Sequence, residues 1–239
     1  MRILILGGTA EARQLAERLV ALGHEVISSL AGRTQDPILP KGDIRMGRFG
    51  GIPGLCAYLR AARIDRLVDA THPYAGQISL HAVQASISTG VPLVRLMRPP
   101  WSPEEGQDWT VLDTAQAAAD ALPSDSRVLL TTGHSGLATF LSRYDCQFFV
   151  RLIEPPEFEL PRHAELMQMR PPYTLENELA LMRRHEITHL VSKNSGGGQT
   201  AAKLEAARQL GIKVFMLARP LYGPAVEVDS VEAAVASIA

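Results

Sequence analysis

The sequence predicts an α/β protein with two Rossmann-like domains, whose parallel sheets face each other across a cleft. Short apolar runs of strand type alternate with segments of helical spacing, and a polar or glycine-bearing turn follows nearly every run. Three prolines within residues 98–103 interrupt this alternation, which restarts after them. We therefore expect a nucleotide-binding domain at residues 1–99 and a second α/β domain at 100–239. A return of the chain to the first domain near the C-terminus is the open alternative.

The expected elements follow from the apolar spacing. In the first half, the strands are 1–6, 24–30, 44–46, 66–70 and 92–97. The helices between these strands are 11–22, 54–62 and 77–88. In the second half, the strands are 110–112, 127–131, 147–153, 189–191 and 213–218. The helices there are 114–122, 174–185 and 200–210.

The first helix shows how such an element is recognised. Its apolar residues recur at i, i+3, i+4, i+7 and i+8 and therefore form one face: Ala12, Leu15, Ala16, Leu19 and Val20. Charged residues occupy the other side of the helix. Because strands and helices alternate in this way, the sheets should be parallel.

Composition excludes several classes of protein. The net charge of −1 and the pI near 6.7 give no electrostatic case for binding nucleic acid or membranes. The N-terminal apolar run is too short for a signal peptide, and no segment approaches the roughly 20 apolar residues of a membrane span. Cys56 and Cys146 lie too far apart in the sequence for a metal or redox motif, so we expect no metal site. We expect a cytoplasmic protein.

A glycine turn joins the first strand to the first helix. A dinucleotide fingerprint, G-x-G-x-x-G/A, would align with Gly7, Thr9 and Ala12. Thr9 replaces the second glycine, and its hydroxyl could donate to a phosphate oxygen or cap the helix. The free N–H groups at a helix N-terminus attract phosphate. We expect Gly7, Gly8, Thr9, Glu11 and Ala12 to bind the cofactor, with a purely structural turn as the alternative.

The end of the second strand favours NADPH over NADH. NAD-preferring enzymes usually carry an acidic residue there, which holds the ribose 2′-hydroxyl. Here Ser28 and Ser29 occupy the place, with Arg33 nearby and no acid before Asp36. Hydroxyls and a guanidinium suit a 2′-phosphate, because they can form charge-assisted hydrogen bonds with it.

Two further groups of polar residues follow predicted strands. Lys193, Asn194, Ser195 and Gly196 open a segment with three glycines, whose backbone N–H groups can surround an anion. It is not a Walker loop, because no Gly-Lys-Ser/Thr follows. We expect residues 193–198 to face the first domain across the cleft and to touch cofactor or substrate. A flexible turn before the last predicted helix is the alternative.

His72 and Tyr74 flank Pro73 at the end of a buried strand. A histidine there can donate a proton near neutral pH, and a tyrosine can hydrogen-bond or stack on a flat ligand. We treat both residues as catalytic candidates, with simple ligand contact and a structural role as alternatives.

Residues 5–12 (ILGGTAEA), 69–75 (DATHPYA) and 192–197 (SKNSGG) together resemble the precorrin-6A reductases of cobalamin biosynthesis, over essentially the whole chain. The resemblance implies that a reduced nicotinamide cofactor saturates one carbon–carbon double bond of a corrin-type macrocycle, giving precorrin-6B. It also implies a tetrapyrrole substrate and neighbouring pathway enzymes as partners. The family includes enzymes for metal-free precorrin-6A and for its cobalt complex. No residue separates the two branches, and the NADP-type residues fit the metal-free branch slightly better.

The negative rim of such a macrocycle could pair with arginines placed in or after predicted strands: Arg95, Arg98, Arg151 and Arg219. Two alternatives to the NADPH-dependent reductase stay open. These are a cobalt-precorrin-6A reductase that uses NADH and a non-catalytic regulator that senses NADPH. A short-chain dehydrogenase does not fit, because none of the five tyrosines has a lysine four positions later.

Overall fold

The structure, a computed structural model, describes residues 1–32 and 38–238. The chain forms two compact units, which we call unit 1 (residues 1–99 and 220–239) and unit 2 (residues 100–219). Our expected second domain, 100–239, is therefore too long. The segment after Arg219 returns to unit 1, which is the alternative that the sequence left open.

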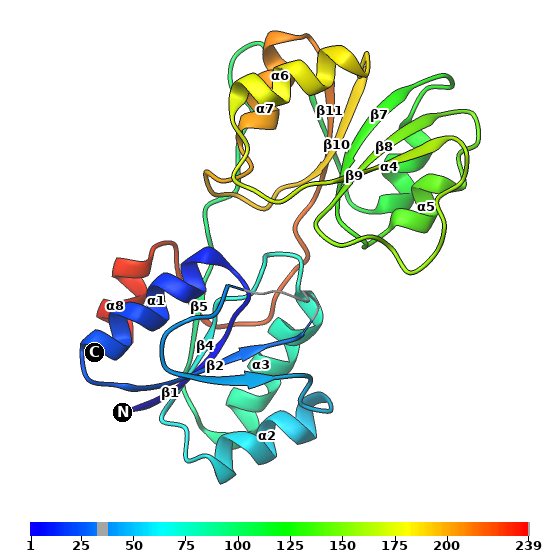
Figure 1. Cartoon of the computed structure of the whole chain (residues 1–239). Coiled ribbons are helices and arrows are strands. Elements are labelled where there is room, and N and C mark those ends of the chain that lie inside the picture. The colour runs from blue at the N-terminus through cyan, green and yellow to red at the C-terminus, as the bar shows by residue number, and fades with distance from the viewer. Residues whose placement is uncertain (33–37, 239) are drawn as a thin grey trace. The chain divides into compact units, whose positions relative to one another are not determined.

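Unit 1 is a parallel six-stranded sheet in the order β12-β5-β4-β1-β2-β3 (Figure 1). Its strands are β1 (Arg2–Leu6), β2 (Glu25–Leu30), β3 (Asp43–Met46), β4 (Arg66–Asp69), β5 (Leu93–Leu96) and β12 (Val226–Val228). Its helices are α1 (Ala10–Ala21), α2 (Gly51–Ala61), α3 (Gly76–Thr89) and α8 (Val231–Ile238).

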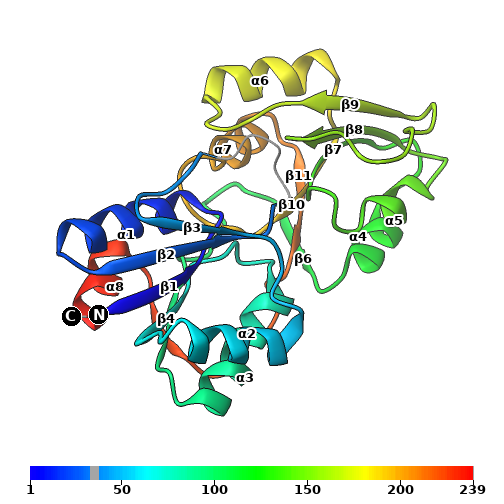
Figure 2. The ribbon, with the colours of Figure 1, turned by 60° about the horizontal axis from the view of Figure 1, so that its bottom comes forward.

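The alternation of β1 divides the core of unit 1 into two layers. Ile3 and Ile5 point to the face covered by α1 and α8. Leu4 and Leu6 point to the face covered by α2 and α3. Figure 2 shows the two helix pairs on opposite faces of this sheet. The strand is fully enclosed, which explains its uninterrupted apolar sequence.

The strand order of unit 1 indicates the edge of the sheet where folds of this type bind ligands. The chain winds outward from β1 through β2 to β3, then crosses to β4 on the other side of β1. Strand order reverses between β1 and β4, and doubly wound sheets bind ligands beyond the carboxyl ends of the strands at such a point. The glycine turn at 7–9 follows β1, and residues 71–74 follow β4.

Unit 2 is a second parallel six-stranded sheet, in the order β6-β11-β10-β7-β8-β9. Its strands are β6 (Trp109–Leu112), β7 (Arg127–Thr131), β8 (Gln147–Leu152), β9 (Ala164–Gln168), β10 (His189–Lys193) and β11 (Lys213–Leu217). Its helices are α4 (Ala115–Ala121), α5 (Leu137–Leu141), α6 (Leu175–Arg184) and α7 (Ala202–Gln209). The strand order reverses between β7 and β10, so residues 193–198 also follow a strand at a reversal point.

The expected strands agree with the observed ones to within two residues, but four elements were missed: α5, β9, β12 and α8. β12 is short, and β9 is an edge strand with exposed glutamate and glutamine, so neither carries a continuous apolar run. α2 begins three residues earlier than expected, because a proline, Pro53, is tolerated in the first turn of a helix. Within the described ranges, every helix is too short or too polar to cross a membrane.

Candidate functional site

Thr9 shapes the turn between β1 and α1. Its Oγ1 accepts a hydrogen bond from the N–H of Ala12 (3.1 Å), which caps α1, and donates one to the carbonyl of Ala70 (2.8 Å). The hydroxyl hydrogen is therefore used within the protein. Of the two roles expected for Thr9, the structure shows the helix cap and not a free phosphate donor.

The two glycines of this turn differ in their surroundings. Gly8 has φ +113°, a conformation that side-chain-bearing residues rarely adopt, and a Cβ there would meet nothing within 4 Å. A Cβ on Gly7 would meet Ala12 Cβ at 3.5 Å, an ordinary contact. The turn therefore leaves open backbone at the N-terminus of α1, which fits a pyrophosphate. Glu11, expected to bind the cofactor, forms an ion pair with Arg98 (3.3 Å).

Two serines end β2, as expected, and their side chains differ. Ser28 is buried, and its hydroxyl has no hydrogen-bond partner among the described residues. Ser29 accepts a hydrogen bond from Arg45 Nη1 (3.4 Å), and its carbonyl accepts one from the N–H of Gly7 (3.0 Å). Arg33, the third residue predicted here, lies outside the described residues.

Sequence reasoning missed Arg45. It lies on β3 directly beside Ser29 in the strand register, so its guanidinium belongs to the same sheet edge. Pairing the predicted strands 24–30 and 44–46 would have revealed this neighbour, because residues that pair in adjacent strands point to the same face.

The loop after β4 is fastened at its base by Asp69. This buried carboxylate accepts hydrogen bonds from the hydroxyl of Thr71 (2.7 Å) and from its N–H (3.3 Å). Further along, the N–H of Tyr74 donates to Nδ1 of His72 (3.2 Å), and the two rings lie 5.9 Å apart. A neutral His72 in this arrangement carries its hydrogen on Nε2. His72 is exposed and Tyr74 is half-buried, so both rings are accessible to a ligand.

In unit 2, Trp101 holds the loop of residues 193–198. Asn194 accepts from the N–H of Trp101 at Oδ1 (2.7 Å) and donates from Nδ2 to its carbonyl (2.9 Å). The indole N–H of Trp101 donates to the carbonyl of Gly197 (3.1 Å). Of the predicted anion-binding residues, Ser195 and Gly196 are buried and Lys193 is half-buried. Trp101 was not predicted, and nothing in the local sequence indicates so distant a contact.

For two of the four arginines, the prediction that they pair with the rim of the substrate is wrong. Arg95 is fully buried in ion pairs with Asp69 and Glu227. Arg151 is buried against Glu178 (2.8 Å). Neither guanidinium can reach a ligand, because each is buried and forms ion pairs with carboxylates of its own unit. Arg98 and Arg219 are half-buried and stay candidates.

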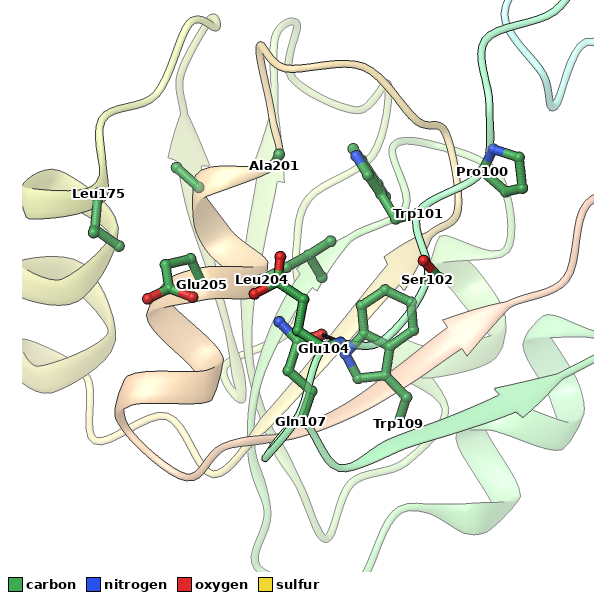
Figure 3. A pocket seen from close by; sticks show the side chains of 11 residues that line it. Pro100, Trp101, Ser102, Glu104, Gln107, Trp109, Leu175, Ala201, Leu204 and Glu205 are labelled. Atoms are coloured by element: carbon green, nitrogen blue, oxygen red, sulfur yellow. Dashed lines mark hydrogen bonds between the residues drawn. The ribbon is translucent and has the colours of Figure 1, made fainter.

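Unit 2 also contains an unusual lysine. Lys203 is buried, with its Nζ 5.0 Å from the centre of the Trp101 ring. The pKa of Lys203 is lowered from its ordinary value to about 7, mainly by burial and also by the nearby charge of Arg151, while Glu178 opposes the shift. Trp101 also lines a hollow of about 500 Å³, together with Trp109 and Glu104 (Figure 3).

Both units are therefore doubly wound α/β structures with polar or glycine-rich loops at the point where strand order reverses, the architecture of many nucleotide-binding enzymes. Residues 2–239 match the model of the family described as precorrin-6x reductase CbiJ/CobK. The chain belongs to this precorrin-6x reductase family and is an oxidoreductase.

Individual relatives agree with this assignment. The chain is 50% identical to a precorrin-6A reductase of Rhodococcus erythropolis, covering 98% of this chain and 96% of the relative. It is 26% identical to a cobalt-precorrin-6A reductase of Priestia megaterium, covering 91% of this chain and 90% of the relative. A solved structure described as CobK precorrin-6A reductase superposes with a TM-score of 0.94 at 39% identity, covering 100% of this chain and 96% of the other.

Proposed function

We propose that this protein is a cytoplasmic precorrin-6A reductase that uses NADPH to reduce one carbon–carbon double bond of the macrocycle, giving precorrin-6B in cobalamin biosynthesis. The observation that carries the proposal is the 50% identity to a precorrin-6A reductase over nearly the full length of both chains. The lower identity to a cobalt-precorrin-6A reductase, 26%, supports the metal-free substrate. The cobalt complex with NADH is the alternative.

The residues of unit 1 fit a nicotinamide dinucleotide. The open backbone at Gly8 and the N-terminus of α1 would hold the pyrophosphate, and Gly7 and Ala12 allow the strand and helix to approach. Thr9 fixes the shape of this turn. The absence of an acid at Ser28 and Ser29 supports NADPH over NADH, with Arg33 as a further contact.

When bound, NADPH supplies the hydride that adds to one carbon of the reduced bond. The neighbouring carbon must then receive a proton. His72 and Tyr74 are candidates to position the substrate and to deliver that proton, directly or through water, with a contribution of roughly 10²–10⁴-fold. We assign Lys193, Ser195 and Gly196 to an anionic group of cofactor or substrate, held in place through Asn194.

The test is an anaerobic assay of the purified full chain with precorrin-6A and NADPH, followed by NADPH absorbance and by the spectrum of the tetrapyrrole. We expect equimolar NADPH oxidation and precorrin-6B formation, and slower turnover with NADH or with the cobalt complex. NADPH binding without turnover would instead identify a regulator. Equal dissociation constants for NADPH and NADH would refute the cofactor preference.

The catalytic candidates are tested in the same assay under single-turnover conditions at saturating NADPH. His72→Ala and Tyr74→Phe should weaken substrate binding or slow reduction modestly. A loss beyond about 10⁴-fold with intact binding would identify a dedicated acid, since a general acid rarely contributes more.

A further inference from the structure

Arg45 is a positive charge held in place at the end of β2 and β3. Its guanidinium carbon lies 3.8 Å from the centre of the Phe49 ring. Nη1 donates to the carbonyl of Gly47 (2.6 Å), and Nη2 donates to the carbonyl of Arg48 (2.9 Å). These contacts fix the plane of the side chain, so little rotamer entropy would be lost if a ligand bound there.

The guanidinium retains unused donors. Of its five N–H groups, three are engaged by the carbonyls of Gly47 and Arg48 and by Ser29 Oγ. Among the residues that the structure describes, the N–H on Nε and one N–H on Nη2 have no acceptor. Over the described ranges, Arg45 forms no ion pair with a carboxylate, so no described residue supplies a counter-ion for its charge.

Arg45 lies where doubly wound folds bind the adenosine ribose of a dinucleotide. Its partner Ser29 lies directly beside the glycine turn, because the Ser29 carbonyl accepts the N–H of Gly7. In this fold, the end of β2 contacts the adenosine ribose of a dinucleotide whose pyrophosphate lies at the glycine turn.

We propose that Arg45 binds the 2′-phosphate of NADPH and so determines cofactor selectivity, with Ser29 as its hydroxyl neighbour. This inference rests on the proposed function. A phosphate suits the site because guanidinium and phosphate form charge-assisted, bidentate hydrogen bonds, whereas the 2′-hydroxyl of NADH offers no charge. The same residue would therefore favour NADPH without affecting the rest of the dinucleotide.

The test compares two probes that differ only in the 2′-phosphate: adenosine 2′,5′-bisphosphate and 5′-AMP. Isothermal titration calorimetry measures their dissociation constants for the wild-type chain, for Arg45→Met and for Arg60→Met. We expect the wild type to bind the bisphosphate more tightly, and Arg45→Met to weaken this binding by about 10-fold or more while changing 5′-AMP by less than about twofold. Arg60→Met removes an exposed arginine at the C-terminal end of α2 and should change neither constant.

The outcomes separate the two proposals. If the wild type prefers the bisphosphate and Arg45→Met keeps that preference, Arg45 does not read the phosphate and the inference is wrong. If the wild type shows no preference, the NADPH assignment itself is wrong and the inference falls with it. Weaker binding of both probes to a variant with a normal melting temperature would show that Arg45 only shapes the turn. Arg45→Lys, which keeps the charge but not the fork, should lose part of the preference; its full retention would exclude bidentate binding.

Discussion

Arg95 donates a hydrogen bond from Nε to Oδ2 of Asp69 across 3.2 Å, at a point where both side chains are withdrawn from solvent. The other oxygen of Asp69, Oδ1, accepts hydrogen bonds from the hydroxyl and the N–H of Thr71. Nη1 of Arg95 reaches the carbonyl of Gly223 and the carboxylate of Glu227. One buried pair thus links β4, β5, the loop that carries His72 and the returning C-terminal segment.

Breaking this pair should destabilise unit 1. We expect Asp69→Ala to cost about 3–5 kcal/mol, because a buried guanidinium loses a buried partner. Glu227→Gln is the matched control on the same arginine: the Glu227 side chain is 54% exposed, so the loss should be about 1 kcal/mol or less. Hydrogen exchange of β4 and β5 peptides measures the difference. Equal protection in the two variants would contradict it.

Thr9 joins two parts of unit 1, and its removal should cost more than the loss of an ordinary helix cap. We expect Thr9→Val to destabilise unit 1 by about 2–3 kcal/mol, since the cap of α1 and the bond to Ala70 are both lost. Thr174→Val removes only the cap of α6 and should cost about 1 kcal/mol. Urea denaturation followed by circular dichroism compares the two, and a smaller loss for Thr9→Val would be contrary to the structure.

The sequence was a good guide to the parallel strands and a weaker guide to the roles of polar side chains. β1, β7 and β11 are enclosed strands, whose apolar runs and following turns are local signals. The return of residues 220–239 to unit 1 depends on contacts with β5 and α1, which no local pattern encodes.

The roles of polar residues in the site also depend on contacts that the local sequence does not indicate. Arg95 looked like a ligand contact by its place in a strand, yet its partners lie in other strands and it is fully buried. Asn194 meets Trp101 across 93 positions of sequence. Residue type predicts the chemistry that a side chain can perform, but the direction in which the side chain points depends on long-range strand pairing. Arg45 was missed for the same reason.

The clamp between Asn194 and Trp101 leads to a prediction about activity. Asn194→Ala should release the loop of residues 193–198 and raise KM by about 10-fold, because two hydrogen bonds that order the loop are lost. kcat should change less, since the amide of Asn194 is directed to the protein backbone. Asn177→Ala, an exposed site on α6, is the control and should leave both constants unchanged. A loss in kcat alone would argue that Asn194 contacts the reacting groups.

Lys203 should make the stability of unit 2 depend on pH. Its pKa is about 7 in the folded protein and near 10.5 when unfolded, so between these values the unfolded chain binds more protons. Stability should therefore rise with pH from about 7 to about 10, by up to about 1.4 kcal/mol per pH unit from this group. Below pH 7 both states are protonated, and the full cost of burying the ammonium remains.

Lys203→Met removes that cost, so this variant should be more stable than the wild type at pH 7, and its advantage should shrink toward pH 10. Tryptophan emission during urea denaturation reports this transition, because Trp101 and Trp109 are the two tryptophans of the chain and both lie in unit 2. Lys213→Met is the control, since the Lys213 side chain is 42% exposed and pairs loosely with Asp108 (3.8 Å). Its difference from the wild type should be flat across the same range. A flat difference for Lys203→Met as well would mean that the buried lysine stays protonated throughout, with the face of Trp101 holding its charge.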